Sequence, residues 1–146
     1  YMMLLATSGA FCGYGSAIWL TGKLGVNRMI IFGTTVGLLG AAVYLALPLM
    51  GIFTPVAAIA PIFLFNIGLA MAFPSVMAAG VSVRPDYAGT AAALNGLVQY
   101  GTAAIATVIV ALLPHTTHLP LAGVIFVTQF AAFIASIVGW RARPVE

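Results

Sequence analysis

Hydrophobic and polar positions follow a simple pattern along this chain, in which long apolar runs are separated by short polar or proline-containing stretches. Two runs, 29–83 and 87–140, contain no charged residue. As one helix the first run would be roughly 80 Å long, whereas about 20 residues suffice to cross a hydrocarbon core of about 30 Å. Each run must therefore turn back once.

Proline and glycine mark where the two runs turn. The stretches are "PLMGIFTP", from Pro48 to Pro55, and "PHTTHLP", from Pro114 to Pro120, and such residues interrupt helices. A third break, "RPDY", carries charge, and its proline favours a clean start for the next helix. The pattern predicts an all-α integral membrane protein with five transmembrane helices, near residues 1–20, 29–49, 55–80, 88–113 and 119–140.

Composition agrees with a chain whose solvent is lipid. Charged residues make up 5% of the chain and hydrophobic residues 63%, against about 25% charged residues in ordinary soluble domains. The positive residues are scattered singly rather than gathered in a patch, so no nucleic-acid partner is expected. The single cysteine, Cys12, excludes an internal disulfide.

The positive charges predict an orientation. Because successive loops alternate between the two sides of the membrane, the five basic residues all fall on one side, which the positive-inside rule makes cytoplasmic. They are Lys23, Arg28, Arg84, Arg141 and Arg143. The N-terminus is then outside and the C-terminus cytoplasmic. A chain that starts outside at Tyr1, with five spans and no leader, is predicted to be the tail of a larger protein.

Small residues recur at helical spacing and predict close helix contacts. The stripes follow i, i+4, i+7, which is one helix face, and in lipid such faces let backbones approach. They comprise Gly9, Gly13 and Ser16; Gly33, Gly37 and Gly40; and Gly89, Ala93 and Gly96. Plain helix packing is the favoured interpretation of each stripe.

A few amides lie inside the predicted spans: Asn66, the pair Asn95 and Gln99 on one face with Thr102, and Gln129. A buried amide in lipid needs a partner or water. It can form an interhelical hydrogen bond, worth about 0.6–2 kcal/mol, or line a substrate cavity. Both interpretations stand for Asn95 and Gln99, and the hydrogen bond is favoured for Gln129.

Other candidate chemistry is sparse. No acidic or basic side chain lies inside a predicted span, so neither a proton relay nor a catalytic constellation is expected within this chain, which predicts no enzyme and no cofactor. His115 and His118 are too few to predict a metal site. Pro74, inside the third span, predicts a kink that supports gating in transporters and is simply tolerated in other membrane proteins.

Three stretches together resemble the major facilitator superfamily. "GYGSAIWLTGKLGVNRMIIFGTTVGLLGAAV" is similar to its eighth span, 8–9 loop and ninth span, with Lys23, Gly25 and Arg28 resembling the second half of the cytoplasmic loop signature. "GLAMAFPSVMAAG" resembles the tenth span, and "AGTAAALNGLVQYGTAA" the eleventh span of drug:proton antiporters, most of all the Bcr/CflA branch. Where the full signature has an acidic residue, this chain offers only Gly25, Val26 and Asn27.

The resemblance implies spans eight to twelve of a twelve-helix transporter in the bacterial inner membrane, working by alternating access with an N-terminal half absent from this chain. It implies proton-coupled efflux of drugs or small amphipathic compounds, with the coupling acid outside this chain. By that mapping Asn66, Asn95 and Gln99 contact the transport path. Helix-interface or gating positions would be Gly9, Gly13, Pro74, Gly89 and Gly96. A facilitator for a sugar or other metabolite and a non-transporting membrane module remain alternatives.

Overall fold

Five long helices and one short 3₁₀ helix make up the described part of the chain, residues 2–52, 54–82, 85–112 and 119–141 of a computed structural model. The helices are α1 (Met2–Leu24), α2 (Val26–Leu49), α3 (Pro55–Ser82), η1 (Pro85–Tyr87), α4 (Ala88–Leu112) and α5 (Leu119–Arg141). The predicted all-helical fold is confirmed. The end of the fourth predicted span, the histidines of "HTTH", Arg84 and Arg143 lie outside the described residues.

The junction between α1 and α2 is tighter than the sequence predicted. Instead of a loop over residues 21–28, only Gly25 interrupts the two helices, at φ 78°. A left-handed φ carries little penalty for glycine, so one residue redirects the chain. Its N–H donates to the Thr21 carbonyl at 3.0 Å, and its carbonyl accepts from the Met29 N–H at 3.2 Å. Lys23 and Arg28 therefore lie on helices, not in a loop.

The second turn follows the prediction more closely. α2 ends at Leu49, with Pro48 inside its last turn, and α3 begins at Pro55. The reversal uses Gly51 at φ 76°, and the Ile52 N–H donates to the Leu47 carbonyl at 3.0 Å.

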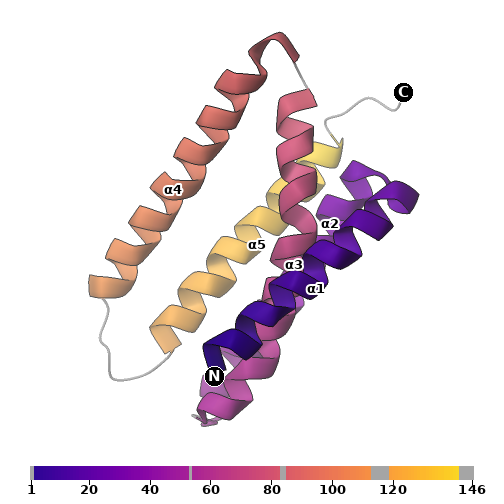
Figure 1. The fold of residues 1–146 in the computed structure, drawn as a ribbon. Coiled ribbons are helices and arrows are strands. Elements are labelled where there is room, and N and C mark those ends of the chain that lie inside the picture. Colours follow the sequence, from indigo (N-terminus) through magenta and orange to yellow (C-terminus); the bar gives the residue numbers. More distant parts are fainter. Residues whose placement is uncertain (1, 53, 83–84, 113–118, 142–146) are drawn as a thin grey trace.

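α3 is the central helix of the arrangement (Figure 1). It packs against α1 on one side and α2 on another, and α2 in turn packs against α5. A small core of Ala17, Met29 and Met71, flanked by Leu20 and Ile67, closes the junction of α1, α2 and α3. α4 is different: it touches α3 and α5 only lightly and has no buried residue. Figure 1 shows it standing apart from α5 along most of its length.

Among the described residues, four helices are long and apolar enough to cross a membrane, namely α2, α3 from Val56, α4 and α5. Large apolar side chains are widely exposed, such as Phe11 at 80% and Leu112 at 82%, which suits lipid contact. These features support a multi-pass membrane protein. α1 is 23 residues long but is not among these four, so its crossing stays a prediction.

Candidate functional site

The glycines of α1 form its contact with α3. A Cβ added at Gly9 would lie 2.6 Å from the Phe63 carbonyl oxygen, and one at Gly13 would lie 2.6 Å from that of Ile67. Real Cβ atoms essentially never approach within 3.0 Å, so any larger residue would force the two backbones apart. The structure thus uses this stripe for helix packing inside the chain. Its predicted contact with a missing half remains a prediction.

The glycines of α2 serve the same purpose against α3. A Cβ at Gly33 would lie 2.7 Å from the Ala72 nitrogen, and one at Gly40 would lie 2.5 Å from the Phe65 nitrogen. The partner position is Gly68, where an added Cβ would collide with the backbone of Gly37. Sequence reasoning did not single out Gly68, because it stands alone rather than in a stripe on α3.

A polar cluster joins α2 to α5. The Gln129 Nε2 donates to the Thr34 carbonyl at 3.1 Å, and the Thr34 hydroxyl lies 3.2 Å from the Ser136 hydroxyl. Gln129 and Thr34 are buried, and Gly37 leaves room for the Gln129 amide. The predicted interhelical hydrogen bond of Gln129 is therefore confirmed. Single hydroxyl residues carry no spacing signal, which is why sequence analysis did not include Thr34 and Ser136.

The amides of α4 have two different environments. Asn95 is half-buried and its Nδ2 contacts the Met77 Sδ of α3 at 2.6 Å. Gln99, one turn further, is exposed. A Cβ at Gly89 or Gly96 would meet nothing within 4 Å, so within the described residues this stripe packs against no helix. One end of α4 is thus attached to α3, and the small-residue face remains uncovered.

Asn66 does not join the other two amides. It is half-buried on α3, and its Nδ2 donates to the Ile62 carbonyl of the same helix at 3.0 Å. It precedes Met77, the contact of Asn95, by three helical turns, or roughly 16 Å along the axis. The three predicted path residues are therefore distributed along the α3–α4 pair rather than gathered at one point.

Pro74 lies exposed inside α3, which continues through it as helix. A proline at this position leaves the carbonyl of Ala70 without its usual helical donor. The next residue, Ser75, is 2% exposed, and its Oγ has no hydrogen-bond partner. The middle of α3 thus has weakened backbone bonding beside an unsatisfied hydroxyl, as a bending point would.

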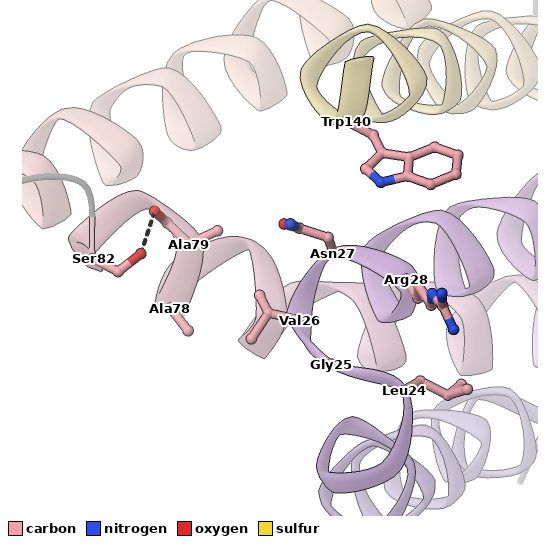
Figure 2. A pocket seen from close by; sticks show the side chains of 9 residues that line it. All are labelled: Leu24, Gly25, Val26, Asn27, Arg28, Ala78, Ala79, Ser82 and Trp140. Carbon is pink, nitrogen blue, oxygen red and sulfur yellow. Dashed lines mark hydrogen bonds between the residues drawn. The ribbon is translucent and has the colours of Figure 1, made fainter. Parts of the chain in front are cut away.

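The signature-like residues lie where several helix ends meet (Figures 1 and 2). The end of α1, the start of α2, and the ends of α3 and α5 enclose a pocket of about 430 Å³, lined among others by Gly25, Arg28, Ser82 and Trp140. Nearby, the Lys23 ammonium lies 3.7 Å above the Trp19 ring, a cation–π contact. Residues far apart in the sequence, from Lys23 to Trp140, therefore share one end of the bundle.

Among the described residues, no three metal-ligating side chains lie together. No family model matches the chain, and no curated protein or solved structure shows significant similarity to it.

Proposed function

We propose that this chain is part of a secondary active transporter of the major facilitator type, which exports drugs or other small amphipathic compounds in exchange for protons. Its role is transport by alternating access rather than catalysis. The proposal rests on the sequence resemblance and draws physical support from the way α4 is held.

The observation that supports the proposal best is the exposed amide face of α4. This helix is apolar enough to span a membrane, yet it has no buried residue and exposes Gln99. An amide facing hydrocarbon is unfavourable, so such residues face other helices or a wet cavity. A transport path between two halves of a transporter is such a wet cavity lined by helices.

The arrangement of the other helices is compatible with a rocking half. The α1–α3 and α2–α3 contacts are glycine-mediated and close, and the α2–α5 contact is locked by the Gln129 hydrogen bond. We infer that helices joined in this way form one rigid unit, whereas α4 has few contacts with it. Alternating access needs such a rigid unit with one face free to meet its counterpart.

The test uses the complete open reading frame that contains this chain, expressed in a bacterium lacking its main efflux pumps. We expect reduced accumulation of a fluorescent amphipathic cation, and we expect a protonophore to abolish the effect. Gln99→Leu should impair export. Thr107→Val, which removes an exposed α4 hydroxyl that donates to the Ala103 carbonyl of the same helix, is the matched control and should not.

Accumulation equal to the vector control, with protein verified in the membrane, would refute drug export. Export that survives the protonophore would refute proton coupling. Sugar or metabolite uptake in a parallel panel would favour the facilitator alternative instead.

A further inference from the structure

Next to the pocket between the helix ends (Figure 2) lies a second, largely apolar cavity. This cavity has a volume of about 610 Å³, lies between α2, α3, α4 and α5, and shares Asn27, Ala79 and Trp140 with the first pocket. Its further lining includes Gly80, Val98, Ala132 and Ala135. The two cavities therefore adjoin: the first, which we call the mouth, has Arg28 in its lining, and the second is mostly apolar apart from Asn27 and the hydroxyls of Thr34 and Ser136.

The mouth is positively charged. Arg28 lines it, and Arg141 follows the lining residue Trp140 on α5. The start of α2 presents the positive end of its helix dipole, but the ends of α1, α3 and α5 present negative dipole ends to the same pocket, so the positive charge comes from the arginine and not from the helix dipoles. The acidic residue Asp86 belongs to η1 and does not line this pocket. Trp140 has an amphipathic ring of the kind that settles at the headgroup level of a bilayer.

We propose that these two cavities form a binding site for an anionic phospholipid. The phosphate lies at the mouth against Arg28, and one acyl chain enters the apolar cavity beside Gly80. A positive mouth matches an anionic headgroup, and an apolar cavity of this size admits a stretch of hydrocarbon chain but no charged group. This inference needs only a membrane setting and is independent of whether the protein transports a substrate.

Quenching of tryptophan fluorescence by brominated lipids tests the site directly. The chain has two tryptophans, so Trp19→Phe leaves Trp140, in the pocket lining, as the reporter. The whole chain is reconstituted in nanodiscs with increasing fractions of dibrominated phosphatidylglycerol or dibrominated phosphatidylcholine. We expect half-maximal quenching at an about fivefold lower fraction of the anionic lipid, the effect of one basic group.

Two pairs of variants locate the phospholipid headgroup and its acyl chain. Arg28→Gln should abolish the anionic preference, whereas Lys23→Gln, which removes one charge outside the pocket lining, should retain it. Gly80→Leu should weaken quenching by both lipids, because Leu fills the apolar cavity. Gly123→Leu, on α5 away from this cavity, is its control; an added Cβ meets nothing within 4 Å at either glycine.

Several results would overturn the proposal. One is equal quenching by the anionic and the zwitterionic lipid. Another is an equal loss of the anionic preference in Arg28→Gln and Lys23→Gln. A third is quenching in Gly80→Leu as strong as in the protein that retains Gly80. Displacement by millimolar inorganic phosphate would likewise overturn it, because a soluble anion would then be the occupant. Circular dichroism of each variant in the same nanodiscs identifies any variant that fails to fold. If one of the two test variants, Arg28→Gln or Gly80→Leu, does not fold, the other one tests the proposal.

Discussion

Gly68 on α3 allows the packing of α2 to be tested with a single methyl group. In the structure a Cβ at Gly68 would lie 2.6 Å from the Gly33 carbonyl oxygen and 2.6 Å from the Gly37 Cα. Both neighbours are backbone atoms and cannot rotate away as a side chain would. We therefore expect Gly68→Ala to separate α2 from α3 and to destabilise the fold.

The magnitude follows from a comparison with Gly80→Ala on the same helix. Both substitutions gain the same helix propensity, up to about 1 kcal/mol, but a Cβ at Gly80 meets nothing within 4 Å. The difference between them isolates the overpacking, which typically amounts to about 1–3 kcal/mol. Gly68→Ala should thus be less stable than Gly80→Ala by that amount, a factor of roughly 5 to 150 in the folding equilibrium.

Unfolding of each variant in mixed micelles with increasing SDS, followed by circular dichroism and tryptophan fluorescence, measures this difference. The midpoint of Gly68→Ala should shift to lower SDS, and that of Gly80→Ala should stay or rise. Equal free energies of unfolding for the two alanine variants would refute close α2–α3 packing at Gly68.

Three further predictions concern other parts of the chain. Gln129→Leu should lower the free energy of unfolding in the SDS assay by about 0.6–2 kcal/mol, whereas Thr128→Val, an exposed neighbour bonded within its own helix, should leave it unchanged; equal effects would contradict the role of the hydrogen bond. In a Cys12→Ala background, Ser82→Cys should react with an impermeant maleimide only in inverted vesicles and Ile52→Cys only in right-side-out vesicles, and the reverse pattern would refute the cytoplasmic assignment. Gly89→Leu should leave the unfolding curve of the chain intact, since its Cβ meets open space; if the proposed transport function holds, it should reduce export, and normal export would refute the interface assignment.

Much of the helical framework was predictable because it depends on local signals. Proline and glycine set the end of α2 and the start of α3 almost where the sequence placed them. The α1–α2 junction was predicted too long, because two charged residues suggest a loop, whereas Lys23 extends back over Trp19 and stays on its helix. Long side chains can reach the interface from within a helix, so charge does not mark the last helical residue.

The candidate site was less predictable, because it depends on which helices become neighbours. Sequence spacing placed Asn95 and Gln99 on one face of the helix. It did not indicate that Asn95 contacts Met77 whereas Gln99 is exposed. Likewise Thr34 and Ser136 are ordinary residues until α2 and α5 meet. The glycine stripes identified which faces of α1 and α2 pack against another helix. They did not indicate that both faces pack against α3.

The two kinds of helix contact in this chain have different mechanical consequences. Where the glycines of α1 and α2 meet α3, the space left between the backbones is too small for an added Cβ, so these three helices are closely packed. Between α3 and α4, within the described residues, the side-chain polar contact is that of the Asn95 amide with the Met77 thioether, which is flexible and tolerant of displacement. A lateral movement of α4 relative to α3 therefore disturbs few contacts, whereas the same movement of α2 disturbs many. If part of this chain moves during its work, α4 is the helix whose movement would break the fewest contacts.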